Sequence, residues 1–388
     1  MSELASFSDF GESTRCSELD GVPVFTNEFW TSKQRAAHSL HEVSYRACFK
    51  PQLPRFFIER LTAPGDLVYD PFMGRGTTLV EAALLGREVA GCDINPLSEV
   101  FTAPRLAPPS FAQVQRRLEI IDFTAVRELR EDLDVFYHRE TLRQLCSLRR
   151  YLLQARRTGT EDAVDAWIRL VAANRLTGHS AGFFSVYTLP PNQAVSIESQ
   201  RRINEKRKQA PACRDVPALI LKKTKQLLAD PARPQLTTAP ILLTQTCETT
   251  PQLDDSSVAL AVTSPPFLDT VDYAQDNWLR AWFCGIDLER VPIWQLRKLP
   301  EWTAAMRSVL RELHRVVCPG GFVAFEVGEV RSGTVRLEEQ VLAAGRAAGL
   351  IPVSILINSQ EFTKTANCWG VDNNSKGTNS NRIVIFQK

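Results

Sequence analysis

Two aspartates and two glycines occur within one short stretch, LVYDPFMGRGTTLVEAALLGREVAGCDINP (67–96). Asp70 ends one apolar run, Asp93 ends the next, and Gly74 and Gly76 lie between them. Two glycines let the backbone pass close to a ligand. Asp70 is placed to accept a hydrogen bond from a cationic amine, and an acid in the position of Asp93 typically binds ribose hydroxyls. The stretch therefore predicts a pocket for a nucleoside-like molecule.

The glycine turn differs from the turns that bind phosphates. A dinucleotide site needs GxGxxG, whose third glycine lets the helix approach the sheet beside a pyrophosphate. Here Thr77, Thr78 and Leu79 follow the second glycine, and the GK[ST] ending of a Walker loop is missing as well. S-adenosylmethionine, which has an ammonium and a ribose but no phosphate, fits this pattern. The alternative is a plain strand-to-helix turn with Asp93 as a surface acid.

A second group of residues follows another apolar run, in AVTSPPFLDTVDY (261–273). Two consecutive prolines fix the backbone and have no N–H group to offer. Ser264 precedes them with a short hydroxyl, and Phe267 follows with a flat ring that can stack on a base. The Ser264 Oγ, the Pro265 carbonyl and the Phe267 face can hold an exocyclic amine towards a methyl donor. Alone, the same residues would also suit an ordinary proline turn.

The elements that must position these residues alternate between strands and helices. The first stretch predicts strand 67–70, helix 77–86, which starts at Thr and stops at Gly, and strand 88–94. The same alternation of strands and helices resumes after residue 240. Strands are expected at 241–245, 258–264, 320–328 and 381–388, and a helix is expected at 303–317. We therefore predict an α/β fold with a Rossmann-like, doubly wound and mostly parallel sheet. Residues 1–20 are expected to form a mobile lead.

Helical periodicity dominates the middle of the chain and indicates an insertion. The predicted division is 1–100 for the first part of the α/β domain, 101–238 for a helical insertion and 239–388 for the second part. The insertion carries 23 Lys and Arg against 14 Asp and Glu, a net charge of +9, and the remainder carries 23 against 30, a net charge of −7. A polyanionic partner would meet the insertion.

Composition is that of a soluble globular protein, with 44% hydrophobic and 23% charged residues. The polar N-terminus is unlike a signal peptide and no run of 18 apolar residues occurs, so we expect no membrane contact. Nine scattered cysteines suggest neither a zinc site nor a disulfide framework. His38 and His41 have a spacing that could suit a metal, but no acid or cysteine supports one. We expect no metal and a cytoplasmic location.

With both motifs considered, the sequence resembles the amino-methylating, S-adenosylmethionine-dependent DNA methyltransferases over roughly residues 25–100 and 240–388. DPFMGRGTT is similar to the family's cofactor loop, TSPPF to its catalytic tetrapeptide, and FKPQLP to its extra cofactor-side element. A serine at the first tetrapeptide position, here Ser264, goes with the N4-cytosine subclass. The cofactor motif precedes the catalytic one, as in the family's α-type order, which places the target-recognition region in the insertion.

The resemblance assigns site residues one by one. It implies catalytic roles for Ser264, Pro265, Pro266 and Phe267, and contacts to S-adenosyl-L-methionine from Phe49, Asp70, Pro71, Phe72, Gly74, Gly76, Thr77, Thr78, Asp93 and Ile94. Two departures stand out. The family usually has an acid after its third strand to hold the adenine, whereas this chain offers Thr246 and Cys247. Phe267 also replaces the commoner tyrosine.

Double-stranded DNA is the partner that the resemblance implies, with the target base flipped out of the duplex. Residues 201–226 hold nine basic and two acidic residues and are either a solvated helix face or a phosphate-binding surface. The candidates for DNA contact are Arg201, Arg202, Lys206, Arg207 and Lys208 for phosphates, and Asn174, Arg175, His179 and Asn192 for bases. Residues 363–382 are either a surface loop or a lid over the base, lined by Trp369 or Asn381. The family implies nucleoid association through DNA and leaves open a cognate restriction endonuclease; oligomeric state is not indicated.

Four alternatives compete with an N4-cytosine enzyme. An N6-adenine DNA enzyme would share the fold and mechanism. An RNA guanine-N2 methyltransferase has a similar cofactor loop, although it usually pairs this loop with Asn/Asp-Pro-Pro-Tyr. A non-catalytic DNA-binding subunit could keep the fold, but the intact motifs argue against it. The 5-methylcytosine route needs a Pro-Cys dipeptide on the catalytic strand, where this chain has Pro-Pro-Phe.

Overall fold

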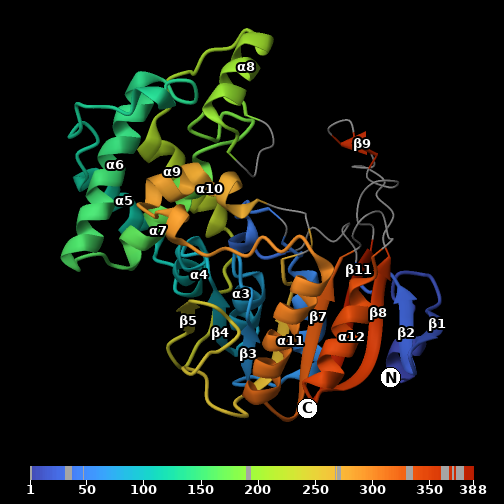
Figure 1. The fold of residues 1–388 in the computed structure, drawn as a ribbon. Coiled ribbons are helices and arrows are strands. Elements are labelled where there is room, and N and C mark those ends of the chain that lie inside the picture. Colours follow the sequence, from blue (N-terminus) through green and yellow to red (C-terminus); the bar gives the residue numbers. More distant parts are fainter. Residues whose placement is uncertain are drawn as a thin grey trace.

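A computed structural model describes residues 2–30, 37–46, 48–188, 194–266, 268, 272–328, 335–359, 367–368, 371–372 and 380–388. Figure 1 shows a twisted sheet with helices packed on its faces and a second group of helices standing above one end of it. The chain ends, N and C, both lie at the sheet end of the molecule.

The sheet has, among the described residues, nine strands in the order β1-β2-β8-β11-β7-β6-β3-β4-β5. Strands β3 to β7 lie in the middle and at one edge, and all their pairings with one another are parallel. Strand β11 runs antiparallel to both of its neighbours, β7 and β8. The strand bounds are β1 Arg15–Leu19, β2 Val22–Asn27, β3 Leu67–Asp70, β4 Glu88–Asp93, β5 Ile241–Thr244, β6 Val258–Thr263, β7 Val317–Val327, β8 Ile351–Ser359 and β11 Ser380–Gln387, with β9 Asn367–Cys368 and β10 Val371–Asp372 paired separately. The predicted α/β class with a mostly parallel sheet is confirmed.

Helices cover both faces of the sheet and bury two apolar layers. On one face, α11 (Leu299–Val316) buries Trp302, Met306, Val309 and Leu313, which recur at helical spacing and therefore form one stripe. Helix α12 (Leu337–Ala347) packs beside α11. The opposite layer includes α2 (Gln52–Leu61), α3 (Thr77–Leu84) and α4 (Leu97–Leu106). Short helical turns are α1 (Ser2–Ala5), η1 (Ser39–His41), η2 (Glu131–Leu133) and η3 (Leu288–Arg290).

The second group of helices comes from the predicted insertion. Its members are α5 (Phe111–Ile120), α6 (Arg139–Thr158), α7 (Ala163–Arg175), α8 (Ile197–Arg207) and α9 (Val216–Leu227). Helix α10 (Tyr273–Cys284), which follows the predicted catalytic motif, packs against α6 and α7. The helical group therefore contains one element from beyond the predicted boundary at residue 238. That boundary, like the rest of the predicted division, remains a prediction.

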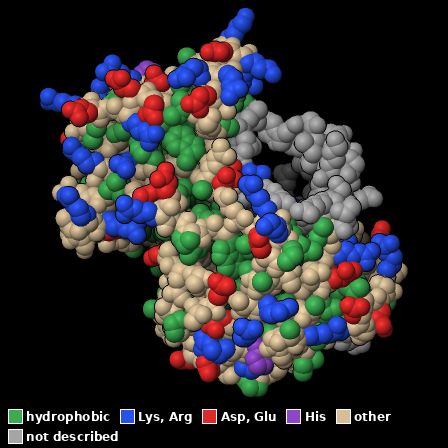
Figure 2. Space-filling view, in the orientation of Figure 1, with side chains coloured by type: hydrophobic (Ala, Val, Ile, Leu, Met, Phe, Trp, Pro, Cys, Tyr) green, Lys and Arg blue, Asp and Glu red, His purple; other side chains and the backbone are tan. Residues whose placement is uncertain are grey.

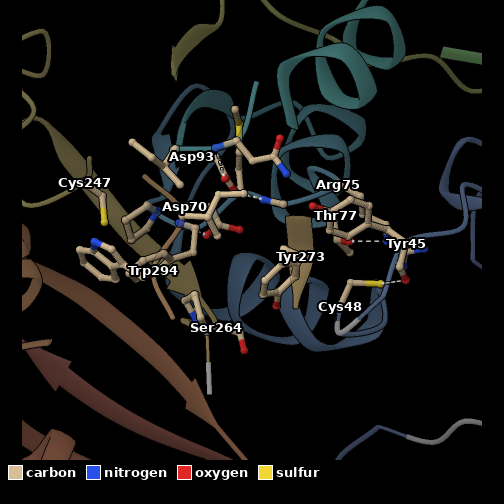
Figure 3. Close-up of a pocket in the computed structure, with 18 of the residues that line it drawn as sticks. Tyr45, Cys48, Asp70, Arg75, Thr77, Asp93, Cys247, Ser264, Tyr273 and Trp294 are labelled. Carbon is tan, nitrogen blue, oxygen red and sulfur yellow. Dashed lines mark hydrogen bonds between the residues drawn. The ribbon is translucent and has the colours of Figure 1, made fainter. Parts of the chain in front are cut away.

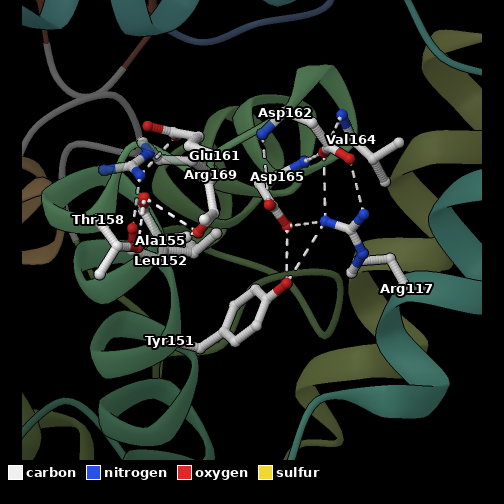
Figure 4. A network of polar contacts seen from close by, with 11 residues as sticks. Arg117, Tyr151, Leu152, Ala155, Thr158, Glu161, Asp162, Val164, Asp165 and Arg169 are labelled. Carbon is white, nitrogen blue, oxygen red and sulfur yellow. Dashed lines mark hydrogen bonds and ion pairs between the residues drawn. The ribbon is translucent and has the colours of Figure 1, made fainter.

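A polar network fastens three of these helices together, as Figure 4 shows. Arg117 of α5 pairs with Asp162, the N-cap of α7, at 2.7 Å and with Asp165 in the first turn of that helix. Tyr151 of α6 donates its hydroxyl to Asp165 at 3.2 Å. Asp162 also accepts from the backbone of Val164, so the same side chain caps α7 and anchors α5.

The N-terminal lead is ordered, contrary to the prediction for residues 1–20. Strands β1 and β2 form an antiparallel hairpin, and β2 pairs in parallel with β8, which extends the sheet by two strands. The Asn27 side chain donates to the carbonyl of Phe7 at 2.9 Å and so ties the preceding segment to the hairpin. The prediction was wrong because the pairing partner, β8, lies at the other end of the chain, where no local pattern reveals it.

In the described part of the chain, no helix has the length and apolar character needed to cross a lipid bilayer.

Gly76 ends the predicted cofactor turn and caps α3 in the left-handed region, with φ +73°. A Cβ atom there would lie 2.3 Å from Thr102 Oγ1 of α4, which real Cβ atoms do not tolerate. The glycine therefore lets α3 and α4 approach each other at the base of the turn.

We predict that Gly76→Ala lowers the free energy of unfolding by about 3 kcal/mol, because left-handed strain and overpacking add. Gly86→Ala is the matched control, since Gly86 has φ +75° but a methyl group added there would meet nothing within 4 Å. It should cost only about 1 kcal/mol, for the strain alone. Urea unfolding of both variants measures the difference, and equal losses would contradict the packing role.

Candidate active site

One pocket lies at the carboxyl ends of β3, β4 and β6, where parallel strands bring their last residues to the same edge (Figure 3). It collects most of the predicted cofactor residues and the first residue of the catalytic tetrapeptide. The described lining consists of Tyr45, Cys48, Phe49, Asp70, Pro71, Phe72, Met73, Gly74, Arg75, Thr77, Asp93, Ile94, Asn95, Gln245, Thr246, Cys247, Ser264, Pro266, Tyr273, Ile293 and Trp294. The two predicted motifs therefore face a single cavity.

Asp70 is the most buried acid of this pocket, with 1% of its surface exposed. Its Oδ1 accepts from Thr263 Oγ1 at 2.6 Å and from the Phe72 N–H at 3.0 Å. Burial raises the pKa of Asp70 to about 7, although these hydrogen bonds oppose the shift. A cationic group beside it would favour the ionised carboxylate.

Asp93 accepts hydrogen bonds that stabilise the glycine turn, and it also lines the pocket. Its Oδ2 accepts from the Gly74 N–H at 2.8 Å, and its Oδ1 accepts from the Asn95 N–H at 2.9 Å. Burial raises the pKa of Asp93 as well. Each carboxylate oxygen has a second lone pair, so Asp93 can also accept hydroxyl hydrogen bonds.

Asn95 also lines the pocket, a position that the sequence pattern did not assign to it. Its side-chain Oδ1 accepts from the Leu97 N–H at 3.1 Å, whereas its Nδ2 is buried and has no partner among the described residues. A buried donor without a partner is costly, and a ligand acceptor would remove that cost. Its place two residues after Asp93, at the same strand end, is the signal that could have found it.

Apolar side chains form the far wall of the pocket. Phe72 and Trp294 meet edge to face, with ring centroids 5.9 Å apart and planes at 60°. Ile94 and Cys247 complete this wall with Ile293, which comes from the connection between α10 and α11. The acid expected after the third strand is indeed replaced by Thr246 and Cys247, and flat apolar surfaces stand at the same end of the pocket.

The opposite end of the pocket is built by the segment before α2. Tyr45 stacks with Tyr273 of α10, with ring centroids 6.4 Å apart at 25°. Arg75 in the glycine turn donates to the Val43 carbonyl at 2.7 Å and to the Phe49 carbonyl at 3.4 Å. The predicted contact residue Phe49 is thereby fastened to the turn and lines the pocket beside Cys48.

Two predicted cofactor residues lie behind the lining. Thr78 is fully buried and donates its hydroxyl to the Val262 carbonyl at 3.2 Å, which joins α3 to β6. Gly76 packs on α4 as described above. Thr77, in contrast, faces the pocket, where its hydroxyl accepts from Arg75 Nε at 3.0 Å.

Ser264 has a partner that the sequence did not reveal. Its Oγ donates to Oε2 of Glu326, which lies at the end of β7, the strand next to β6. Glu326 is 4% exposed, and its Oε1 accepts from Asn381 Nδ2 of β11 at 2.9 Å. Burial raises the pKa of Glu326. A hydroxyl that lines the pocket is thus coupled to a buried acid.

The prolines of the tetrapeptide divide between two environments. Pro266 lines the pocket, and its carbonyl accepts from Trp302 Nε1 at 2.8 Å, which anchors the motif on α11. Pro265 is not among the lining residues. Phe267, Trp369 and most of residues 363–382 lie outside the described residues, so the predicted stacking face and the predicted lid stay predictions.

The basic residues predicted to contact DNA lie on and just after α8 and are exposed: Arg201, Arg202, Lys206, Arg207 and Lys208. Figure 2 shows Lys and Arg side chains gathered over this helix at the top of the molecule. Arg207 stacks on Tyr187, with 3.8 Å between its guanidinium carbon and the ring centroid. These contacts to DNA remain predictions.

The predicted base-reading residues occupy different surroundings. His179 is exposed, and its ring centroid lies 6.1 Å from that of Phe183. Arg175 is 9% exposed and donates to Asn174 Oδ1 at 2.7 Å, while Asn174 itself is 2% exposed and bonded to the Ser44 carbonyl. Asn192 lies outside the described residues.

The two histidines with metal-like spacing are engaged separately. His41 Nε2 pairs with Glu81 at 2.7 Å, and burial lowers the pKa of His41 to about 4. His38 Nε2 lies 3.0 Å from the Ala232 carbonyl. Among the residues that the structure describes, no three His, Cys, Asp or Glu side chains gather as a metal-ligand set.

Comparison with known proteins finds matches to part of this chain. A family model described as DNA methylase matches residues 17–98, which include the glycine turn and both pocket aspartates. The chain is 34% identical over 111 residues to the type II methyltransferase M.MvaI of Kocuria varians, covering 28% of this chain and 23% of that protein. These matches support an amino-methyltransferase family. S-adenosyl-L-methionine is the cofactor of that family, and the two acids, the unpartnered Asn95 amide and the flat apolar wall fit its ammonium, ribose and adenine.

Two further relatives extend the comparison. The type II methyltransferase M.BsoBI of Geobacillus stearothermophilus is 20% identical over 307 residues, covering 70% of this chain and 58% of that protein. A tRNA (guanine(10)-N2)-dimethyltransferase of Methanocaldococcus jannaschii is 28% identical over 103 residues, covering 26% of this chain and 29% of that protein. The matched regions thus span between 23% and 58% of the lengths of these three relatives.

The raised pKa of Asp70 predicts pH-dependent cofactor affinity. The ionised carboxylate binds a cationic amine much more strongly than the neutral carboxyl does, so the affinity is fully present well above pH 7 and falls as the pH drops through about 7. The dissociation constant for S-adenosyl-L-methionine should rise about tenfold per pH unit below about 7. Calorimetry across neutral pH measures this dependence. Asp70→Asn should bind weakly at every pH, and a wild-type affinity that is flat with pH would contradict the assignment.

Proposed function

We propose that this chain is a site-specific DNA methyltransferase that moves a methyl group from S-adenosyl-L-methionine to the exocyclic N4 amine of a flipped-out cytosine in duplex DNA. The observation that carries the proposal is the coupling of Ser264 to buried Glu326 on the wall of the cofactor pocket. A hydrogen-bonding group and a proton acceptor at this wall are what amine alkylation requires. The partial match to DNA methyltransferases supports DNA as the substrate class.

Different pocket residues contact the ammonium, the ribose and the adenine of the cofactor. Asp70 accepts from the ammonium, Asp93 accepts from the ribose hydroxyls, and the Asn95 Nδ2 donates to an acceptor of the nucleoside. The rings of Phe72 and Trp294 flank the adenine. They contact it where the family usually has an acid after its third strand. When bound, S-adenosyl-L-methionine supplies an electrophilic methyl group on its sulfonium. The protein contributes orientation and a dry, preorganised polar environment, and no covalent intermediate with the enzyme is required.

Ser264 and Glu326 act on the amine. Ser264 Oγ accepts one N–H of the target amine and directs the nitrogen lone pair towards the cofactor. An alkylated amine must lose one proton, which passes to Ser264 Oγ while the serine proton passes to Glu326 Oε2. Glu326 must be ionised to accept that proton, and Asn381 holds its second oxygen. The pair therefore works as an orienting group with a buried base behind it.

Duplex DNA would contact the exposed basic face of α8. Phosphate contacts of this kind fix the register of the duplex but do not read its sequence. Flipping costs a few kcal/mol, which stacking and edge hydrogen bonds in the pocket offset. Asn381 donates to Glu326, so the start of β11 forms part of the proposed base site.

Two alternatives keep the same mechanism. An N6-adenine DNA enzyme would use the same pair on another amine, and Ser264 is the residue that favours cytosine. The similarity to a tRNA guanine-N2 enzyme over 26% of the chain favours an RNA substrate, whereas Ser264 and the basic insertion count against it.

The test of the proposal is methyl transfer by Glu326→Gln. Its kcat on unmethylated genomic DNA should fall about 100-fold or more, because the amide cannot accept the proton. The wild-type rate should rise with pH, since the raised pKa of Glu326 leaves the carboxyl protonated at low pH, and the variant should lose this rise. Rapid-quench assays with labelled cofactor measure both quantities.

Two controls accompany that measurement. Glu312→Gln removes another buried acid, which bonds Thr250 and lies outside the pocket, and should leave the kcat of the folded enzyme unchanged. Cofactor affinity of Glu326→Gln should equal that of the wild type. Wild-type kcat and pH dependence in the glutamine variant would reject the role of Glu326, and transfer of label to RNA but not to DNA would reject the substrate.

A further inference from the structure

A second hollow, of about 430 Å³, lies against the cofactor pocket and shares Tyr45 and Arg75 with it. Its floor is the segment of residues 41–45, which crosses between the glycine turn and the helical group. Arg175 from the end of α7 and Lys223 from α9 form its other wall. The hollow is open to the surface and its lining is mainly polar.

Three cationic side chains converge on this hollow with one acid. Lys223 Nζ lies 3.0 Å from Glu42 Oε2, but the lysine side chain is 6% exposed and that of Glu42 is 60% exposed. Arg175 donates to the Asn174 carbonyl and side chain and stacks on Phe183 at 4.0 Å. Its described contacts include no carboxylate. Glu42 therefore offsets part of the charge of Lys223, and the net charge of the three cations and one acid stays positive.

Arg75 adds to the positive charge, since its partners in the described structure are the Thr77 hydroxyl and backbone carbonyls. Two more buried arginines stand behind the floor. Arg105, fully buried, donates to the Leu40 and Arg75 carbonyls, and Arg280, 5% exposed, donates to the Ser44 carbonyl and to Asn277.

The result is a region in which the positive charge is only partly compensated. Burial lowers the pKa of Arg105 to about 9 and that of Arg175 to about 10, and it lowers the pKa of Lys223 and Arg280. Each of these shifts means that the surroundings disfavour the charged form. An anion in the hollow would reverse this penalty, and a guanidinium and an ammonium are the groups that proteins use for phosphate.

We propose that the hollow formed by Arg75, Arg175 and Lys223 binds one backbone phosphodiester of the DNA strand that carries the target base. The proposal rests on the function proposed above and adds a phosphate site to the DNA contacts proposed for α8. Because the hollow shares a wall with the cofactor pocket, a phosphate held there lies near the nucleotide that enters the pocket. It would fix the strand while the base leaves the stack.

Two substitutions test the site in opposite directions. Lys223→Gln removes one buried cation and should weaken DNA binding about tenfold and reduce the slope of log K against log salt by about 1. Glu42→Gln removes the acid and should strengthen DNA binding several-fold; because this side chain is exposed, the variant should keep the wild-type Tm. Calorimetric affinity for S-adenosyl-L-methionine should stay at the wild-type value in both variants.

The matched control is Lys298→Gln. Lys298 also has a carboxylate partner, Glu301 at 3.1 Å, but its side chain is 77% exposed and lies outside the hollow. This variant loses the same charge and the same kind of ion pair, so it reports the effect of net charge alone. Its DNA affinity should stay within about twofold of the wild type, and a loss equal to that of Lys223→Gln would overturn the proposal.

Inorganic phosphate distinguishes the two sources of the anion. At constant ionic strength, millimolar phosphate should leave the Tm of the wild type nearly unchanged if the hollow is shaped for a phosphodiester held by its strand. A Tm increase in the wild type that is absent from Lys223→Gln, together with wild-type DNA binding by both variants, would assign the hollow to free phosphate and overturn the proposal. Failure of the wild type itself to bind DNA would instead reject the proposed function.

Discussion

The hydrogen bond from Thr263 to Asp70, 2.6 Å long and buried, joins the two halves of the site. Thr263 is the last residue of β6, directly before Ser264, and Asp70 is the last residue of β3, directly before the glycine turn. The bond therefore fixes the strand that bears the proposed amine site against the strand that bears the proposed cofactor site. It works because parallel neighbours end at one edge of the sheet, where their terminal side chains can meet.

The same constraint explains why the site draws on residues far apart in the chain. Strand β7 lies beside β6 and delivers Glu326 to Ser264, and β11 lies beside β7 and delivers Asn381 to Glu326. The chain of contacts from Asp70 through Thr263 and Ser264 to Glu326 crosses the neighbouring strands β3, β6 and β7. The residues in each contact are close in space because their strands are neighbours in the sheet, although they are far apart in the sequence.

Sequence patterns predicted the elements whose formation depends on residues close together in the chain. The strand at 67–70, the helix that begins at Thr77 and the strand that ends at Asp93 follow from apolar runs, caps and glycines within one continuous stretch. The hairpin β1–β2 and the partners of Ser264 could not be predicted in this way, because they depend on pairing with distant strands. Trp294 was missed for a related reason: it stands in an irregular connection whose path over the pocket is set by the packing of α10 and α11.

Charge distribution was predicted only in outline. The net charge of +9 in residues 101–238 pointed to a polyanion, and the exposed residues of α8 agree with that interpretation. The concentration of cations around the 41–45 segment was not visible, since Arg75, Arg105 and Arg280 come from three separate parts of the chain. Burial, which sequence counting ignores, turns these scattered arginines into a strongly positive region.

The central claim is that Ser264 and Glu326 act on the N4 amine of cytosine. The most direct measurement incubates the protein with labelled S-adenosyl-L-methionine and unmethylated genomic DNA, digests the DNA and separates the nucleosides by mass. The account predicts label in N4-methylcytosine. Label in N6-methyladenine would keep the pocket and the proton transfer but contradict the base assignment, and DNA without label would contradict the claim as a whole.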